Sequence, residues 1–274
     1  MIEPQPYFTT NAPPRHATRL ALTLAALLLA AGAGLARADD ADTQTQIALG
    51  AGVERMPEWI GASNHRNQAV PYVDIEIPGI GELSTADGLT VDLINADKLH
   101  GGLYGNYLWG RTRDGLGPHL GGIVDSLGPR VQAGGYLEYH PTKQFSYGAN
   151  LSHDTQGAGA YLNLYADYQL PNLGYIEHEF ELQWQSMNGA AMNRFFGFNA
   201  AQAAALGTPT WRPGAGSQQI GLEYDAFIPT SQHTGFALAL GYTRLLGQAG
   251  DSPLVSRFGQ RNQFSQTLAF VYHF

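Results

Sequence analysis

Cysteine is absent from all 274 residues of the chain. This absence excludes disulfide frameworks, zinc sites with cysteine ligands, thiol catalysis and lipid anchors attached to cysteine. Charge is also scarce, since 14% of the residues are charged, against about 25% in a typical soluble domain. The balance is acidic, with 15 Lys and Arg against 23 Asp and Glu. Because phosphate binding requires a basic patch, we expect no nucleic-acid partner.

Long apolar runs are missing after the first 38 residues, so nothing later in the chain resembles a membrane-spanning helix. The apolar run 20–35 follows two arginines and precedes an Ala-x-Ala-like sequence at 36–38, which is the layout of a secretory signal peptide. A membrane anchor is the alternative, but it needs roughly 20 apolar residues. We therefore expect residues 1–38 to be cleaved, leaving 39–274. Cleavage would remove three arginines and one glutamate and change the net charge from −8 to −10.

The exported part repeats an alternation of large apolar residues with small or polar ones. In 264–274, Phe270 and Tyr272 belong to one face, and Ala269 and His273 belong to the other. Period two indicates a strand. Similar patterns predict twelve strands, at 44–53, 69–77, 80–86, 88–94, 99–109, 129–140, 143–153, 158–170, 173–186, 216–228, 233–246 and 263–274. If the pair at 80–94 is not formed, ten strands remain.

Many strands of about ten residues with one apolar face, in an exported chain, are typical of an outer-membrane β-barrel. The connections agree, because short turns rich in Pro, Gly and Asn alternate with the long segments 54–68, 110–128, 187–215 and 247–262. The sequence thus predicts an all-β fold, a transmembrane antiparallel up-and-down β-barrel with short inner turns and long outer loops. One outer loop contains a predicted short helix at 199–206.

A soluble β-sandwich or lipocalin-like barrel is the alternative fold. It would turn the apolar faces inward and expose the polar ones. Lys98 and Lys143 are the only lysines in the chain, whereas soluble surfaces usually carry more. The chain also ends on an aromatic strand at Phe274, whereas soluble domains usually end in loose polar residues. Both observations favour the membrane barrel.

Acidic residues gather on the polar faces of several predicted strands, which would line the lumen. The inner faces would carry Asp74, Glu76, Asp92 and Glu138 together with the candidate lining residues Asp167, Glu177, Glu179, Glu181, Glu223 and Asp225. Such a lining would favour cations, by the logic of charged rings in channels. The simpler interpretation, which the sequence favours, is that these residues hydrate a narrow, filled lumen. The size of the barrel does not decide between these two interpretations, because twelve strands lie between filled eight-stranded barrels and open sixteen-stranded porins.

No catalytic constellation emerges from the sequence. The histidines show no H-E-x-x-H spacing. Ser152, His153 and Asp154 are adjacent, but neighbouring residues on a strand point to opposite faces and cannot form a triad. A phospholipase-like site built from separate strands is the disfavoured alternative. We therefore expect no enzymatic activity, no cofactor and no metal.

Several short motifs follow one another along the exported chain. They are Pro57-Glu58-Trp59-Ile60-Gly61-Ala62-Ser63 with Pro71-Tyr72-Val73, then Gly88-Leu89 with Val91, Gly121–Gly135, Phe196-Gly197-Phe198, Leu245–Val255, and Tyr272 with Phe274. In order and spacing this set resembles the MipA/OmpV family of MltA-interacting proteins over essentially the whole exported chain. Two features depart from the family pattern: Trp59 replaces the usual Tyr, and one loop ends in Trp211-Arg212-Pro213. They concern loop recognition, not the fold.

The resemblance implies a barrel in the outer membrane of a Gram-negative bacterium. It also implies a scaffold in cell-envelope maintenance that links a murein hydrolase, a lytic transglycosylase, to a murein synthase, a penicillin-binding protein. A scaffold needs about 800 Å² of contact per partner, which short inner turns supply poorly. The alternatives are a small cation-preferring channel or solute-binding barrel, and a surface adhesin acting through 110–128 and 187–215.

The last strand carries a further expectation from the resemblance. Its pattern resembles the C-terminal signal that the barrel-assembly machinery recognises, and the residues concerned are Leu268, Phe270, Tyr272 and Phe274. The remaining expected partners are outer-membrane lipid and lipopolysaccharide, which would surround the apolar outer face.

Overall fold

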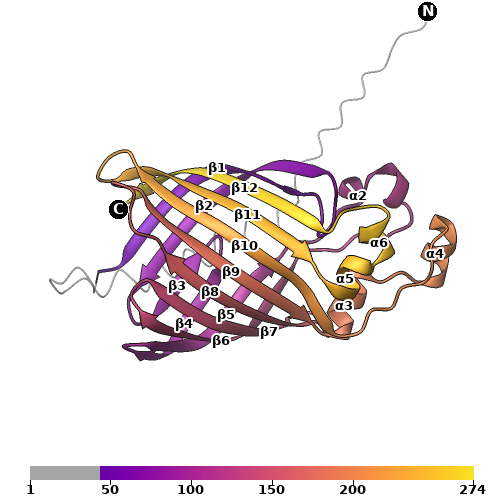
Figure 1. Ribbon diagram of the computed structural model, residues 1–274, viewed down its shortest axis with the longest axis horizontal. Helices are drawn as coiled ribbons and strands as arrows, with labels where there is room; N and C mark the ends of the chain where they lie inside the picture. Colours follow the sequence, from indigo (N-terminus) through magenta and orange to yellow (C-terminus); the bar gives the residue numbers. More distant parts are fainter. Residues whose placement is uncertain (1–43) are drawn as a thin grey trace, which may run out of the picture. The chain divides into compact units, whose positions relative to one another are not determined.

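The fold is that of a computed structural model, which describes residues 44–274 (Figure 1). The expected signal peptide and its cleavage site lie outside the described residues. Within 44–274, no helix is both long and apolar enough to cross a membrane.

Twelve strands close into a single antiparallel barrel in which each strand pairs with its neighbours in the chain and β12 pairs with β1. The strands are β1 (Gln46–Pro57), β2 (His65–Ile77), β3 (Gly81–Ser84), β4 (Gly88–Ala96), β5 (Leu99–Leu108), β6 (Arg130–Thr142), β7 (Phe145–Asp154), β8 (Ala160–Gln169), β9 (Glu177–Met187), β10 (Gly216–Pro229), β11 (Thr234–Leu245) and β12 (Asn262–His273). The prediction of an all-β, twelve-stranded up-and-down barrel is confirmed. The two weakly patterned strands β3 and β4 both form.

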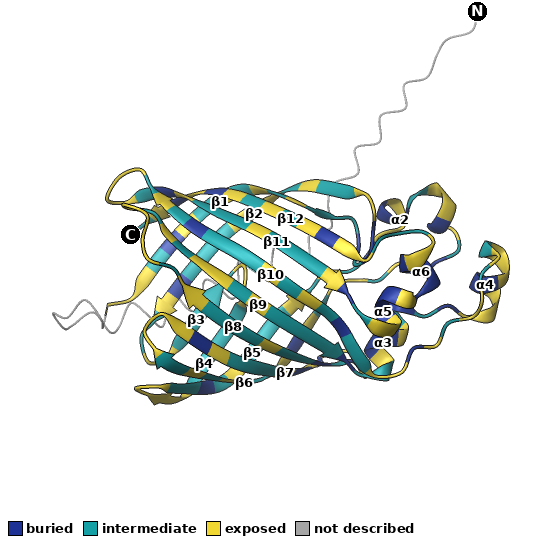
Figure 2. Ribbon diagram, in the orientation of Figure 1, coloured by how far each residue is buried: buried dark blue, intermediate teal, exposed yellow. Residues whose placement is uncertain are grey.

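Alternation along the strands separates an outer face of large apolar residues from an inner face of small or polar ones. On β12, Leu268, Phe270 and Tyr272 are exposed on the outside, whereas Ala269 and Val271 between them are buried. The register places Val53 of β1 opposite Leu268 and continues the apolar band across the seam of the barrel. Figure 2 shows how exposed and buried residues are interleaved along the strands.

The two ends of the barrel differ. Short turns and the C-terminus lie at one end, and all the described helices lie at the other (Figure 1). The helices are α2 (Arg113–Leu120), α3 (Gly189–Phe196), α4 (Ala200–Leu206), α5 (Gly247–Asp251) and α6 (Pro253–Ser256). By the predicted topology the turn end is periplasmic and the helical end is external.

The sequence predicted one short helix, and it is found as α4. Asn199 and Gln202 form a capping box at its start, and Gly207 ends it with φ +61°. The other four helices were not predicted. Helix α2 is kinked at Gly117 and contains Pro118, so its local sequence opposes a regular helix. Helices α5 and α6 span five and four residues, too few for a periodic pattern.

These helices belong to a cap, defined here as the loop segments 58–64, 109–129, 188–215 and 246–261. Two apolar clusters hold the cap together. The first contains Met192, Phe195 and Phe196 of α3 with Leu245 and Val255. The second joins the remaining loops through its buried members Trp59, Ala62, Leu116, Leu120, Val124, Phe198 and Leu254. Because all four segments share apolar cores, the cap is a packed lid and not a set of independent loops.

Candidate functional site

The barrel encloses a cavity of about 820 Å³. Its lining extends from Pro78 and Gly79, in the turn between β2 and β3, to Tyr161 and Met187. Tyr161 and Met187 also belong to the first apolar cluster of the cap. The cavity therefore runs from the turn end of the barrel to the underside of the cap. The expectation of a narrow, filled lumen is not the arrangement found.

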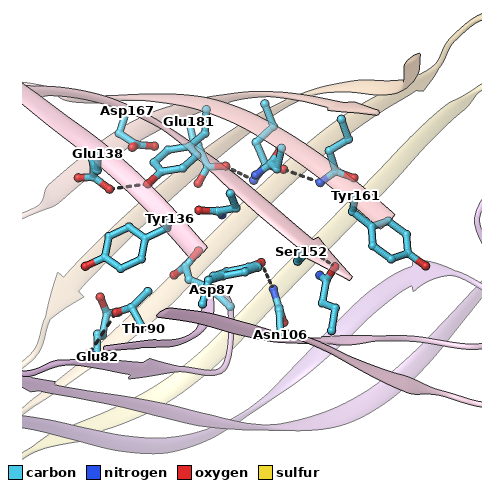
Figure 3. Close-up of a pocket in the computed structure, with 18 of the residues that line it drawn as sticks. Glu82, Asp87, Thr90, Asn106, Tyr136, Glu138, Ser152, Tyr161, Asp167 and Glu181 are labelled. Atoms are coloured by element: carbon cyan, nitrogen blue, oxygen red, sulfur yellow. Dashed lines mark hydrogen bonds between the residues drawn. The ribbon is translucent and has the colours of Figure 1, made fainter. Parts of the chain in front are cut away.

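Acidic side chains dominate the charge of this cavity. Its lining contains the carboxyl groups of Glu76, Glu82, Asp87, Asp92, Glu138, Asp167, Glu179 and Glu181. Among the described residues that line it there is no lysine or arginine, and the only other titratable nitrogen groups are His100 and His140. Figure 3 shows Glu138, Asp167 and Glu181 on one side of the space, with Glu82 and Asp87 on the other.

Strand register explains why the acids of β8, β9 and β10 lie together. Asp167 is directly opposite Glu181, which is directly opposite Glu223 on the other side. Glu179 is likewise opposite Asp225. Residues directly opposite each other share a face of the sheet, and like charges in such pairs repel. A cation placed before this row would relieve that repulsion.

The six acids expected to line the lumen divide into two groups. Asp167, Glu179 and Glu181 line the cavity. Glu223 and Asp225 share the row through register but do not border this cavity. Glu177 begins β9 at the turn end, is exposed and lies outside the lining.

Neutral groups supply the hydrogen bonds that the carboxylates accept. Tyr165 donates to Glu138 at 2.7 Å, and Ser146 donates to Asp167 at 3.0 Å. Tyr136 donates to Asp92, and Gln183 donates to Glu181. These donors orient the carboxylates without neutralising them. Glu138 also lies 2.6 Å from the Nε2 atom of His140. The negative charge of the other lining carboxyl groups is left for a solute to balance.

Two acidic residues of the site were missed from the sequence. Glu82 belongs to the four-residue strand β3, and Asp87 lies in the turn that follows it. Asp87 accepts a hydrogen bond from Ser84 at 3.2 Å, within the turn. Strand β3 is too short for a clear alternation, so its inner face could not be identified. Within 44–274, no group of three or more His, Asp or Glu side chains is arranged to hold a metal ion.

The roof of the cavity is tied to the wall by buried ionic contacts. Asp154, at the end of β7, pairs with Arg194 of α3 at 2.5 Å and with Arg130 at 3.5 Å. Tyr161 donates to the same carboxylate at 3.0 Å. These residues were not singled out for this role, because Arg194 lies 40 positions from Asp154 and no short-range pattern joins them.

A second tie lies within the cap. Arg111 donates to the carbonyl oxygens of Asp125 at 2.9 Å and Phe195 at 2.6 Å. Burial lowers the pKa of Arg111 to about 10, and the nearby Asp125 partly opposes this. The guanidinium thus remains charged at neutral pH and joins segment 109–129 to the end of α3.

Comparison with known proteins gives one family and several similar barrels. The family model described as MltA-interacting protein MipA matches residues 49–274. No curated protein sequence matches the chain. Similar solved structures include an outer-membrane channel from Pseudomonas putida F1, with 10% identity, a TM-score of 0.41, and coverage of 87% of this chain and 100% of that one. A bacterial polysaccharide outer membrane secretin is 9% identical, with a TM-score of 0.38 and coverage of 86% and 99%. The NanC porin is also 9% identical with a TM-score of 0.38, and coverage is 84% and 99%.

Proposed function

This chain belongs to the MltA-interacting protein MipA family and is an outer-membrane barrel, and we propose that its lumen selects small cationic solutes. One observation carries the proposal: eight carboxyl groups line the cavity and no described lysine or arginine does. In this proposal the protein has no enzymatic activity of its own, and its barrel supplies only binding and passage.

The direction of access follows from the two ends of the barrel. Cavity residues reach the turn between β2 and β3, where Pro78 and Gly79 border it. At the other end, Tyr161 and Met187 lie under the packed cap. A solute thus meets the carboxylates from the turn end, and passage to the outside requires the cap to open. Focusing of the negative potential between low-dielectric walls would concentrate cations at this site.

The test is conductance and selectivity of the purified full chain in planar bilayers under a KCl gradient. We expect a reversal potential that favours K⁺ over Cl⁻. The double variant Glu179→Gln/Glu181→Gln removes two lining charges and should move the reversal potential toward zero. Glu177→Gln is the matched control, because it removes the same charge from the same strand outside the cavity lining.

A cap that stays closed would suppress current, so binding of tetramethylammonium to the protein in nanodiscs is measured by calorimetry alongside. Weaker binding in the double variant, with unchanged binding in Glu177→Gln, supports the proposal. Anion preference in the bilayer, or absence of both current and cation binding in the unmodified protein, would reject it.

A scaffold for murein-remodelling enzymes is the second candidate, and a feature of the turn end favours it. The turn between β8 and β9 exposes Leu173 at 62% and Tyr175 at 86%, and the turn between β2 and β3 exposes Ile80. Contiguous exposed apolar patches mark contact sites for proteins or membranes, and Leu173 and Tyr175 lie two residues apart in one turn. The description of the family as MltA-interacting points to a lytic transglycosylase as the partner.

This second candidate is tested by co-purification from detergent-solubilised envelopes. The unmodified protein should retain a lytic transglycosylase or a penicillin-binding protein. The variant Leu173→Ser/Tyr175→Ser should lose the partner and keep the folded barrel. Leu222→Ser, on the lipid-facing side of β10, is the control for loss of an exposed apolar side chain. Retention of neither enzyme by the unmodified protein would exclude the scaffold.

A further inference from the structure

The wall of the barrel is incomplete in its outer half, because β3 and β4 are short there. Strand β3 pairs with only the last part of β2, from Asp74 to Ile77. Strand β4 begins at Gly88, and its pairing with β5 reaches no further than Gly105. Above the turn between β3 and β4, the facing edges of β2 and β5 have no strand between them among the described elements. We call this gap the β2–β5 window.

The β2 edge of the window has a residue that cannot donate a ladder hydrogen bond. Val73 accepts a hydrogen bond from the backbone N–H of Thr85 at 2.8 Å and donates its own N–H to the Oγ1 atom of Thr85 at 2.9 Å, so its polar groups point toward β3. Backbone direction alternates along an antiparallel strand, and Pro71 and Ala69 therefore point their polar groups into the window. Pro71 lacks an N–H and is tolerated only at strand edges. At this position Pro71 loses no ladder hydrogen bond, because no neighbouring strand is there to accept one.

On the β5 edge of the window, a side chain of the same strand satisfies one exposed N–H group. Val131 of β6 accepts from Thr155 beyond β7, so it does not bond the opposite residue, Tyr107. Tyr107 therefore directs its backbone into the window. Its N–H donates to the Oδ1 atom of Asn106 at 2.6 Å. A side chain thus takes the place of the missing neighbouring strand.

The β2 edge of the window belongs to the same outer face as the lipid-facing band. Ala69 is opposite Val53, which is opposite Leu268 on the apolar exterior. Two positions further along β1, Arg55 marks the change to a polar exterior. Above the window, the guanidinium of Arg66 lies 5.7 Å from the ring of Trp109 and closes its outer margin.

Unpaired strand edges do not face hydrocarbon, because each unsatisfied backbone group there costs several kcal/mol. The window must therefore contain water or polar groups of a ligand. It also communicates with the cavity, since Ala86, Asp87, Asn106 and Tyr107 are all cavity-lining residues. Figure 3 shows Asp87 and Asn106 together on the inner side of this region.

We propose that the β2–β5 window is a lateral port through which an amphipathic cation passes between the acidic cavity and the outer leaflet. The cationic head would meet Asp87 and the carboxylates beyond it, while the alkyl chain remains among the lipid chains. The choice of a cation rests on the proposed function of the lumen, whereas the port itself rests on strand pairing.

The port is tested by bridging it. The chain has no cysteine, so Ala69→Cys and Tyr107→Cys in one variant provide the only two thiols, which a bis-maleimide links across the window. With the protein in nanodiscs, the rate at which dodecyltrimethylammonium and tetramethylammonium enter the cavity is then compared before and after bridging. We expect uptake of the dodecyl compound to slow at least tenfold and that of tetramethylammonium to change less than twofold. The control bridge joins Leu182→Cys and Leu222→Cys, which are opposite each other in an intact part of the wall.

The port proposal would be overturned if uptake of the dodecyl compound were equal before and after bridging, or if bridging slowed the uptake of both cations equally. If the unmodified protein binds neither cation, the proposed function fails, and a second measurement still decides the port. A fluorophore on Ala86→Cys, beside the window, is compared with one on Gln219→Cys, which lines the cavity behind the intact wall. Brominated lipids should quench the first at least twofold more strongly, and equal quenching would contradict the port.

Discussion

The carboxylate of Asp154 pairs with the guanidinium of Arg194 at 2.5 Å and joins the outer end of β7 to helix α3. The Asp154 side chain is only 1% exposed. Arg130 and Tyr161 contact the same carboxylate. This buried network fixes the cap over the acidic cavity.

Removing the charge of Asp154 should loosen the cap. Breaking one side of a buried ion pair costs about 3–5 kcal/mol. We expect Asp154→Asn to lower the free energy of cap unfolding by about that much. Protease cleavage within segment 188–215 at increasing urea concentration measures it. The pair of Asp251 and Arg261 is exposed on both sides. Exposed pairs contribute about 0–1 kcal/mol, so Asp251→Asn serves as the control. Equal effects of the two substitutions would contradict a special role for Asp154.

Arg111 should stabilise the cap through its backbone contacts. The variant Arg111→Ala leaves the carbonyl of Phe195 without its donor, and a hydrogen bond to a charged group contributes about 1.5–3 kcal/mol. The folded pKa of about 10 lies below the unfolded value, so the unfolded chain binds this proton more tightly. By linkage the titration of this group changes stability only above about pH 10, where stability rises with pH. The loss of stability in Arg111→Ala should therefore be the same at every pH between 6 and 9 in thermal unfolding, and a loss that varies with pH over this range would contradict this.

Gly134 should be intolerant of any side chain. A Cβ atom at this position would overlap the carbonyl oxygen of Leu151 on the neighbouring strand. The backbone of a closed barrel cannot yield easily, and overpacking costs about 1–3 kcal/mol or more. We expect Gly134→Ala to lower the urea midpoint and Gly134→Val to prevent folding. Gly122→Ala is the control, because nothing lies within 4 Å of its Cβ.

The last strand should govern assembly more than final stability. Phe274 is 74% exposed, and surface substitutions usually change stability by no more than about 0.5 kcal/mol. We propose that Leu268, Phe270, Tyr272 and Phe274 are recognised by the barrel-assembly machinery. Deletion of Phe274 should then slow insertion several-fold in an assay with that machinery, with an unchanged urea midpoint. Phe264→Ser, at the other end of the strand, should not slow insertion.

Cation selectivity of the lumen should weaken with ionic strength. The screening length falls from about 10 Å at 0.1 M to about 3 Å at 1 M salt. The row of Asp167, Glu181 and Glu223 would then act on a solute only at contact. Reversal potentials measured at one fixed KCl ratio should approach zero at high salt. Selectivity that is independent of salt would indicate a steric filter instead.

Much of the fold could be predicted because the period of two is a local signal. In β12 and β9, each residue's neighbours along the chain reveal its face, and a residue such as Glu181 can be assigned to the inside without knowing its partners. The order of long and short connections then gives the antiparallel barrel. Alternation fails for β3, whose four residues are too few, and Glu82 was missed for that reason.

The sequence by itself determined the barrel, its acidic inner faces and its capped loop helix α4, since each depends on residues near one another in the chain. Only the tertiary structure decided that four loop segments merge into one cap, because their cohesion comes from apolar contacts among distant residues such as Trp59, Leu116 and Leu254. Strand pairing likewise decided where the wall stops. Pro71 lacks an N–H wherever it lies in a sheet, but the strand edge that it leaves without a partner depends on β3 ending at Ser84.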